Sequence, residues 1–312
     1  MISYDFRVPA NKQVRYIVHT DCMNEADDQY TLAHILMTPK LRVTGIVAGH
    51  FDKTNTRGIP AGKTTQASYD EIIHIMNLMH QDGDYAVWMG ATTYLKDDHT
   101  PIDSDGARFI IHEAMKMDPL PLYIGMQGSL TDLASAILME PKICSRMTAI
   151  WIGGGDYPNG GQEFNLMQDV HAANVVFHSD MPLWQIPIST YKQFSVSLAE
   201  LQYKVKPHGK IGSYLFKNLI TLNEKAGSRD GIWPHGEIWG LGDEGVIAAL
   251  MEETEKRDSY KMLPAPSIDP KTLQYLPGKP DRYIRVYHTM NARMDLEDFF
   301  CKLAIQFPNP DS

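Results

Sequence analysis

Cysteine is scarce in this sequence, and long apolar runs are absent. Only Cys22, Cys144 and Cys301 occur among 312 residues, and their wide spacing excludes a disulfide-stapled secreted scaffold. A reducing compartment is expected, and we predict a cytoplasmic protein. No stretch reaches 18 consecutive apolar residues, and the N-terminus lacks a basic end followed by an apolar run. Neither a membrane span nor a signal peptide is therefore expected.

Positive charge is also limited. The chain has 29 Lys and Arg residues against 38 Asp and Glu residues, and its formal net charge is −9. The Lys and Arg residues form no block, whereas a nucleic-acid-binding surface needs clustered cations to contact phosphates. A small-molecule partner is expected instead, and neither a nucleic acid nor a membrane.

Apolar residues make up 43% of the chain and follow an alternating pattern. Short β-branched runs predict strands at residues 14–20, 43–49, 85–89, 120–126, 147–152, 183–187 and 282–288. Helical spacing predicts helices at 26–37, 65–80, 105–117, 129–139, 169–178 and 294–305. Residues 189–257 read as mainly helical, and the Pro-rich stretch 264–280 is expected to be a loop.

This alternation predicts a doubly wound α/β fold, because strands separated by helices pair in parallel through right-handed crossovers. The strands are almost entirely apolar, which is typical of a mostly parallel sheet with helices on both faces. No repeat or linker divides the chain, so residues 1–312 are expected to form a single domain.

Four acidic residues lie close together just after the first predicted strand. Asp21, Glu25, Asp27 and Asp28 fall within eight residues, and like charges this close repel unless a cation lies among them. Acids also favour a helix N-terminus, which explains two of the four. The density of the group, and Asp21 at the strand end, favour a cation site. Without His or Cys at ligand spacing, Ca²⁺ or Mg²⁺ is favoured over Zn²⁺.

Three further segments could contribute to a site at the strand ends, where parallel α/β sheets bind ligands. Residues 125–132 follow a strand, and their glycines would let a backbone carbonyl face a metal. Residues 240–245 place Asp243 on a Gly-framed turn. Taken alone, each resembles an ordinary helix start. In the Gly-rich segment 152–165, Glu163 and Asn165 read as partners for sugar hydroxyls.

Several other catalytic motifs are excluded. Residues 58–64 resemble a phosphate-binding P-loop but are one residue short and do not leave a strand. The His112-Glu113 pair lacks the second His of a zinc protease, and no Gly-x-Ser-x-Gly motif is present.

Together these segments resemble the inosine-uridine-preferring nucleoside hydrolase family. The family's Asp-Thr-Asp signature with its later Asp-Asp pair is matched by residues 19–28. Its Gly-Pro-Leu-Thr-Asn-Leu-Ala segment is matched by residues 128–134, and its Glu-Phe-Asn motif by residues 163–165. Its His-Asp-Pro segment is matched by residues 242–244. The resemblance covers residues 14–255, and it implies a nucleoside-hydrolase-like doubly wound fold in a divergent member.

The resemblance also implies roles for individual residues. One Ca²⁺ would be held by four groups: Asp21, Asp28, Asp243 and the carbonyl of Gln127. The ribose hydroxyls would be held by Asp27 at the 2′ position, Asn165 and Asp243 at the 3′ position, and Glu163 with Asn159 at the 5′ position. Asp21 would act as the general base on water, and His50 stands where the family usually has Asn.

Four positions depart from the family pattern. His19 replaces the first Asp, Met23 the Gly, Asp132 the Asn, and Gly242 the His that often helps the leaving base depart. For the leaving-group side we consider His235 as an acid, with Trp233 and Trp239 as stacking surfaces for a base. A packed loop is the alternative interpretation of that segment.

The function expected from the resemblance is Ca²⁺-dependent hydrolysis of ribonucleosides to ribose and free base. The altered leaving-group side leaves two alternatives open: metal-dependent hydrolysis of another ribosyl or glycosyl compound, and sugar binding without catalysis. The resemblance implies a homo-oligomer, a dimer or a tetramer. Purine and pyrimidine substrates are not distinguished at this point.

Overall fold

The computed structural model describes residues 4–225, 236–252 and 258–309. Its centre is an eight-stranded sheet in which every strand pair is parallel except the last, β12 with β9. In spatial order the strands are β3 (Val87–Met89), β2 (Leu41–Ala48), β1 (Val14–Thr20), β4 (Leu122–Met126), β5 (Met147–Ile152), β6 (Leu183–Ile186), β12 (Tyr283–Tyr287) and β9 (Tyr260–Pro264).

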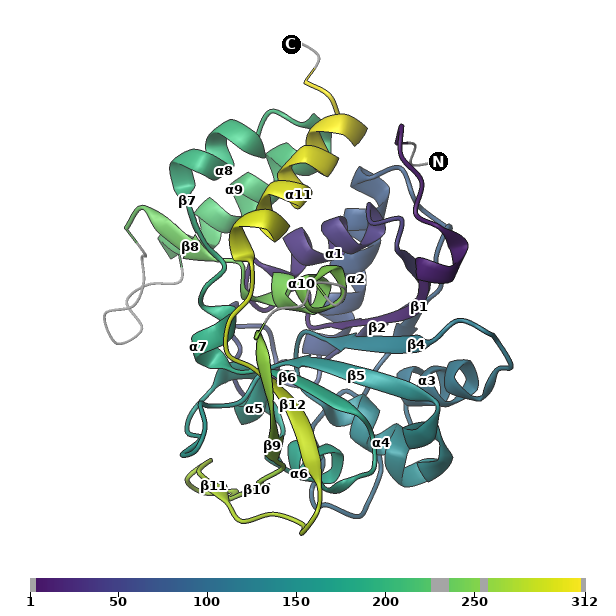
Figure 1. Ribbon diagram of the computed structural model, residues 1–312. Helices are drawn as coiled ribbons and strands as arrows, with labels where there is room; N and C mark the ends of the chain where they lie inside the picture. The colour runs from purple at the N-terminus through teal and green to yellow at the C-terminus, as the bar shows by residue number, and fades with distance from the viewer. Residues whose placement is uncertain (1–3, 226–235, 253–257, 310–312) are drawn as a thin grey trace.

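Helices cover both faces of this sheet (Figure 1). On one face lie α1 (Asp28–Leu36), α2 (Thr64–Leu78), α9 (Gly209–Lys225), α10 (Gly245–Met251) and α11 (Ala292–Gln306). On the other face lie α3 (Asp105–Met115), α4 (Thr131–Met139) and α6 (Val170–His178). The prediction of a mostly parallel sheet with helices on both faces is confirmed.

Shorter elements complete the fold. The remaining helices are η1 (Ala10–Lys12), η2 (Pro141–Ser145), α5 (Phe164–Gln168), α7 (Ile188–Tyr191), α8 (Leu198–Lys204) and η3 (Gly242–Glu244). Two small antiparallel pairs are formed by β7 (Ser195–Ser197) with β8 (Ile238–Gly240) and by β10 (Ser267–Ile268) with β11 (Tyr275–Leu276).

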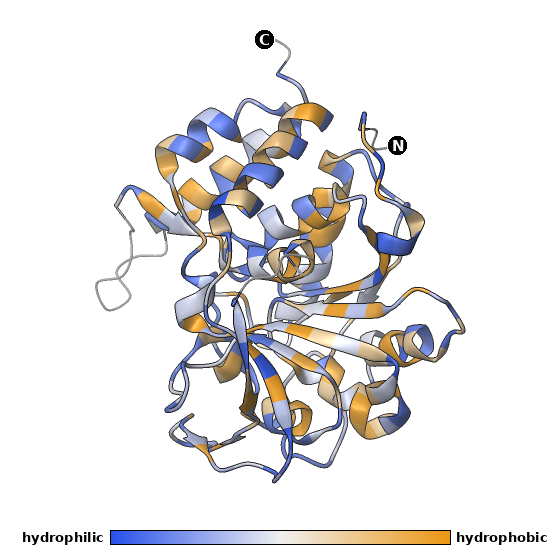
Figure 2. Cartoon of the chain, viewed as in Figure 1, coloured by the Kyte–Doolittle hydropathy of each residue, from blue (hydrophilic) through white to orange (hydrophobic). Residues whose placement is uncertain are grey.

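The core follows from strand geometry. Successive side chains point to opposite faces, so Tyr16 and Val18 pack with the α1 side while Ile17 packs with the α4 side. All seven residues of β1 are buried, as expected for a strand covered on both faces. Figure 2 shows much of the central strands and α10 in the hydrophobic colour. None of the described helices is both long and apolar enough to cross a membrane.

Most predicted elements are present with ends shifted by no more than two residues. The described residues of the stretch 189–257 are mainly helical, as expected, although they also contribute β7 and β8. One prediction needs correction, because the expected loop 264–280 contains β10 and β11. Strand β9 was not predicted. These strands are short or lie at an edge, so they lack the apolar runs on which the prediction depends.

Local capping residues fix where the helices near the strand ends begin. The Ser104 hydroxyl accepts a hydrogen bond from the backbone N–H of Ala107, and the Asp169 carboxylate accepts one from Ala172. Such caps satisfy backbone donors that the first turn of a helix leaves free. Helices α3 and α6 are thereby anchored at the edge of the sheet that carries the candidate site.

Trp151 in β5 tests the contribution of the core beneath this edge. Its side chain is fully buried, and its indole N–H donates to the carbonyl of Gly128 at 3.0 Å. Trp151→Ala is expected to lower the free energy of unfolding by about 3–5 kcal/mol, because it leaves a large cavity. Urea denaturation measures the change.

The matched control is Met117→Ala, since Met117 is 92% exposed. This variant should remain within about 0.5 kcal/mol of the unmodified protein. Equal stability losses in the two variants would contradict the assignment of Trp151 to the core.

Candidate functional site

The candidate site forms where the carboxyl ends of parallel strands meet. His19 of β1 is in register with Met126 of β4, which is in register with Trp151 of β5. The residues that follow these strands, Asp21 and Gln127 among them, therefore come to one edge of the sheet. The 3₁₀ helix η3 and the N-terminus of α1 reach the same edge, because the backbone N–H of Asp243 lies 3.4 Å from the Asp27 carboxylate.

Three acidic side chains converge at this edge from distant parts of the chain. Asp27, Asp28 and Asp243 each offer a carboxylate oxygen within 4.8 Å of the other two. The Thr20 hydroxyl donates to Asp28 at 2.5 Å. Asp21 is outside this group of three, but its negative charge raises the pKa of both Asp28 and Asp243. We call Asp21, Asp27, Asp28 and Asp243 the acidic cluster.

Burial makes the acidic cluster electrostatically costly. It raises the pKa of Asp21, Asp28 and Asp243 well above the usual range, and the neighbouring carboxylates raise it further. The pKa of Asp27 rises to about 6, chiefly through burial. Among the described residues, no Lys, Arg or His forms a salt bridge with these four acids. The described residues therefore supply no counter-charge to these four acids.

The donors present fit a hard divalent cation. The cluster offers only oxygen atoms, which Ca²⁺ and Mg²⁺ prefer. Both side-chain amide atoms of the buried Gln127 lack a hydrogen-bond partner among the described residues. Asp21 also lies against Gly128, where a Cβ atom would be only 2.7 Å from Asp21 Oδ1. The described part of the chain thus contains an acidic site suited to a metal ion.

Asn165 lies at the same edge and connects the ends of β4 and β5 through hydrogen bonds. Its side-chain amide donates to the carbonyl of Gln127 at 3.1 Å and to that of Ile152 at 2.9 Å. The Gln127 carbonyl, predicted to be a metal ligand, therefore already accepts one hydrogen bond, and a carbonyl oxygen has a second lone pair. Asn165 and Gln127 are brought together as predicted, but their proposed ligand contacts stay predictions.

Glu163 has a structural role that the sequence analysis missed. Its buried carboxylate caps α5, accepting from the N–H groups of Asn165 and Leu166, and it also accepts from Gly154 N–H at 2.8 Å and the Tyr191 hydroxyl at 3.0 Å. These four donors fill the acceptor capacity of a carboxylate. For Glu163 to hold a sugar hydroxyl, one of them must move, and Tyr191 is the only side chain among them.

The residues predicted for the 5′-hydroxyl and for the base do not gather at one place in the described part of the chain. Asn159, predicted at the 5′-hydroxyl, is exposed at the tip of a turn, and its backbone carbonyl accepts from Tyr275 N–H. Trp239 of β8 is 3% exposed and packs within the hydrophobic core, so it presents no free face for a base. This placement argues against its predicted stacking role. Trp233 and His235 lie outside the described residues.

Two departures from the family pattern prove to be one interaction. His19 stands in place of an Asp and Asp132 in place of an Asn, and their side chains form a buried pair, His19 Nε2 to Asp132 Oδ2 at 3.0 Å. Asp132 also accepts from Ser104 and from the N–H of Ala91. Burial opposes ionisation of Asp132, but these hydrogen bonds and His19 lower its pKa overall. Compared with the family pattern, the carboxylate of this pair is therefore at position 132 instead of position 19.

His50 belongs to a neighbouring buried network. Its Nε2 atom lies 2.8 Å from the Thr131 hydroxyl, which donates to Asp169 at 2.7 Å. Since that hydroxyl has one proton, Nε2 of His50 must carry the hydrogen of this contact. Burial lowers the pKa of His50, so its Nδ1 atom is an acceptor, and no described residue donates to it.

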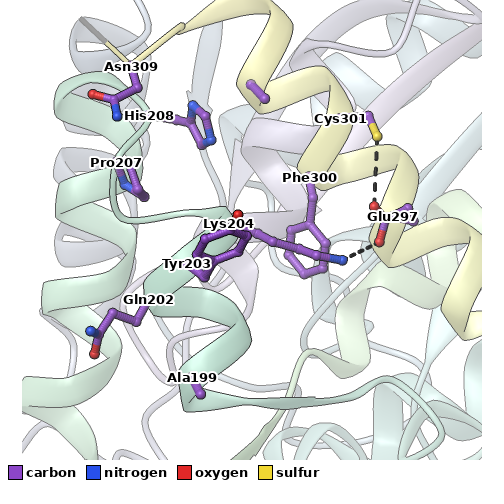
Figure 3. Close-up of a pocket in the computed structure, with 11 residues that line it drawn as sticks. Ala199, Gln202, Tyr203, Lys204, Pro207, His208, Glu297, Phe300, Cys301 and Asn309 are labelled. Atoms are coloured by element: carbon purple, nitrogen blue, oxygen red, sulfur yellow. Dashed lines mark hydrogen bonds and ion pairs between the residues drawn. The ribbon is translucent and has the colours of Figure 1, made fainter. Parts of the chain in front are cut away.

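A pocket of about 560 Å³ lies away from this edge, between α8 and α11 (Figure 3). Tyr203, Phe300 and Cys301 are among its lining residues, and none of the predicted site residues belongs to it. The candidate site is therefore defined by the chemistry of the strand ends and not by this pocket.

Residues 16–296 match the model of the inosine-uridine preferring nucleoside hydrolases, and the chain belongs to this family. The resemblance drawn from the sequence is confirmed. An inosine-uridine preferring nucleoside hydrolase from Leishmania major is 27% identical over 185 residues, which cover 58% of this chain and 57% of that protein. One from Crithidia fasciculata is 31% identical over 117 residues, 36% of each chain. The matches thus span little more than half, or less, of these relatives.

Solved structures confirm the fold across nearly the whole chain. A purine-preferring ribonucleoside hydrolase from Gardnerella vaginalis has a TM-score of 0.71 at 17% identity, covering 94% of this chain and 98% of that one. A plant nucleoside hydrolase has a TM-score of 0.70, also at 17% identity, covering 93% of this chain and 98% of that one.

The His19–Asp132 pair generates a prediction about stability. His19→Asp places a second carboxylate against Asp132 in a fully buried position and should lower the free energy of unfolding by about 3–5 kcal/mol. Adding Asp132→Asn creates the family's own pair and should restore most of the loss. Urea denaturation of both single variants and the double variant measures the coupling, with far-UV circular dichroism as the control for folding. Strictly additive losses would show that the two side chains do not act as a pair.

Proposed function

We propose that this protein hydrolyses the N-glycosidic bond of ribonucleosides, giving ribose and free base, with Ca²⁺ bound at the strand ends. The observation that carries the proposal is the convergence of Asp27, Asp28 and Asp243, with Asp21 beside them, in a chain of this family. Carboxylates suit a hydrolase of this reaction type, because positive charge develops on the sugar in the transition state.

Asp28, Asp243, Asp21 and the Gln127 carbonyl would hold the ion. When bound, Ca²⁺ would act as a Lewis acid toward water and the ribose hydroxyls. Its positive charge would also keep the buried carboxylates ionised at neutral pH, opposing the rise in their pKa caused by burial.

Asp21 would be the general base. Its carboxylate is 2% exposed, and the Asn24 side chain donates to Oδ2 at 3.2 Å, which fixes its orientation. It would take the proton of the attacking water as the glycosidic bond breaks. Asp27, half-buried at the start of α1, would accept from the 2′-hydroxyl, and Asn165 with Asp243 would hold the 3′-hydroxyl. These contacts strengthen as the ribosyl cation forms.

The leaving-group side supports a second candidate within the same chemistry. Gly242 stands where the family often has His, and a Cβ atom there would be 2.8 Å from the Tyr191 ring. No side chain at position 242 can therefore protonate a departing base. This favours a ribosyl or glycosyl compound whose leaving group departs without a proton from that position. A panel of nucleosides and nitrophenyl ribosides, assayed for free ribose, distinguishes nucleoside hydrolysis from hydrolysis of another ribosyl or glycosyl compound.

We further propose a single-domain protein, since no linker divides the sequence, and a cytoplasmic one, since cysteine is scarce. From the resemblance we propose that it forms a dimer or a tetramer. Size-exclusion chromatography with light scattering measures the oligomeric state.

Asp21→Asn tests the general base. Turnover should fall by about 10²–10⁴-fold, because the amide cannot accept the proton. Ribose release from a nucleoside panel measures this, and Asp180→Asn, a change at a carboxylate that is 87% exposed, is the matched control with unchanged turnover. Near-normal turnover in Asp21→Asn would remove Asp21 from this role.

Asp243→Ala tests the metal assignment. The variant should lose both Ca²⁺ and ribose affinity, since Asp243 supplies a carboxylate to both. Isothermal titration with Ca²⁺, then with ribose in excess Ca²⁺, measures the two losses. Ca²⁺ binding equal to that of the unmodified protein would contradict the assignment of Asp243 as a ligand.

A further inference from the structure

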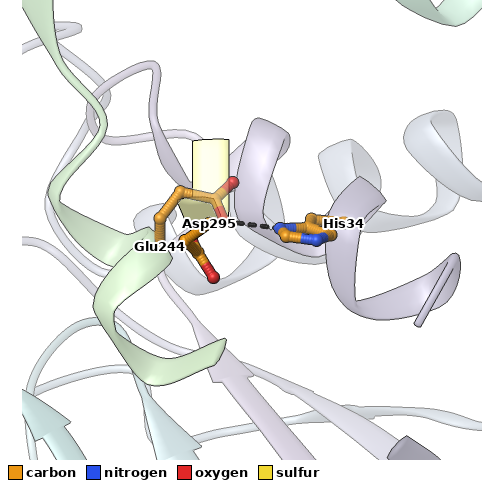
Figure 4. A group of neighbouring side chains, drawn as sticks. All are labelled: His34, Glu244 and Asp295. Carbon is orange, nitrogen blue, oxygen red and sulfur yellow. Dashed lines mark hydrogen bonds and ion pairs between the residues drawn. The ribbon is translucent and has the colours of Figure 1, made fainter. Parts of the chain in front are cut away.

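A second group of ionisable side chains lies beneath the sheet edge, among the helices of the α1 face. His34 of α1, Glu244 of η3 and Asp295 of α11 each offer a ligand atom within 4.8 Å of the other two, and all three are fully buried (Figure 4). His34 Nδ1 lies 2.7 Å from Glu244 Oε2. No step of the proposed reaction uses these residues.

Three carboxylate oxygens of this group have no hydrogen-bond donor among the described residues. They are the two carboxylate oxygens of Asp295 and Oε1 of Glu244. Burial raises the pKa of Asp295 well above its usual range, and both the charge of Glu244 and a hydrogen-bond contact between the two carboxyl groups raise it further. An ionised carboxylate in such a place needs a positive partner.

The surroundings of His34 resemble those of a metal-binding histidine. Its Nε2 atom is 3.0 Å from Asp298 Oδ2, and Asp298 is itself bonded to Lys302. When Nε2–H donates to Asp298, the lone pair of Nδ1 faces Glu244 Oε2 at 2.7 Å, a contact that requires a proton or a cation beside the two atoms. A carboxylate that orients a ligating imidazole through its other nitrogen is the usual second shell of a metal site.

We propose that His34 Nδ1, Glu244 and Asp295 bind a divalent first-row transition ion such as Zn²⁺, which joins α1, η3 and α11. One imidazole with two carboxylates suits Zn²⁺ or Mn²⁺, whereas Ca²⁺ and Mg²⁺ prefer oxygen donors alone. The neighbouring residues Asp243 and Glu244 thus serve two sites of different chemistry. This site does not depend on the proposed hydrolase activity.

A shared proton is the competing explanation. One carboxyl group of the Glu244–Asp295 pair could be protonated, with His34 as an imidazolium between Glu244 and Asp298. That arrangement would leave no place for a metal. It also predicts that Asp295→Asn is tolerated, because an amide can donate to Glu244 as the carboxylic acid would.

The metal content of the purified protein decides between a bound transition metal and a shared proton. The protein is produced in medium containing Zn²⁺, Mn²⁺ and Ca²⁺, purified in the presence of a chelator that strips surface metal, and measured by mass spectrometry of the elements. We expect about one equivalent of Zn²⁺ or Mn²⁺ per chain, since all three ligand side chains are fully buried and the bound ion should exchange slowly. Asp295→Asn should reduce this to a trace and lower the melting temperature.

Variants at neighbouring positions provide the controls. Asp298→Asn, which removes only the orienting carboxylate, should weaken metal affinity by about 10–100-fold. Glu297→Gln changes an adjacent residue of α11 that pairs with Lys204 and should retain the full metal content. Asp28→Asn, a change in the acidic cluster, should leave the transition-metal content unchanged. A wild-type protein without transition metal, or an Asp295→Asn variant that is equally stable, overturns the proposal in favour of the shared proton.

Discussion

The repulsion among buried carboxylates at the strand ends is the constraint on which the site depends. Asp28 follows the first strand and Asp243 lies more than two hundred residues later. The parallel sheet and η3 nevertheless bring them close enough for one ion to bind both. Without a counter-charge, burial would protonate these groups, and protonated acids could neither accept a proton from water nor stabilise a ribosyl cation. In the proposed account, metal binding, sugar binding and catalysis are therefore three consequences of one electrostatic arrangement.

The surroundings of that cluster show how a divergent family member keeps its core. The substitutions at positions 19 and 132 exchange an acid–amide pair for a histidine–acid pair, so a polar contact between β1 and α4 is retained. On the leaving-group side the changes are not compensated in this way. The ring of Tyr191 packs against Gly242, and its hydroxyl donates a hydrogen bond to the Glu163 carboxylate. Tyr191 therefore connects position 242 to Glu163. In the proposed account, the acidic cluster and Asn165 would recognise ribose, and the residues around Gly242 would set which leaving group is accepted.

The sequence predicted the sheet, its covering helices and the acidic cluster, because these depend on local patterns and on the rule that parallel strands end together. It could not predict β9, since residues 260–264 are largely exposed at an edge and show no apolar run. It also could not pair His19 with Asp132 or His34 with Asp295, because those contacts join residues more than a hundred positions apart. Trp239 was predicted to stack on a base instead of packing in the core, for a related reason. An aromatic residue in a Gly-rich segment serves equally as core or as binding surface, and only tertiary packing decides.

The central claim is that a cation gathers these acids into a sugar-binding pocket. A crystal structure of the protein grown with Ca²⁺ and ribose tests it most directly. The account predicts one seven- or eight-coordinate ion with oxygen ligands at about 2.3–2.6 Å, supplied by Asp28, Asp243 and the sugar hydroxyls. Carboxylates that stay turned away from one another around ordered water, with neither ion nor ribose between them, would contradict it.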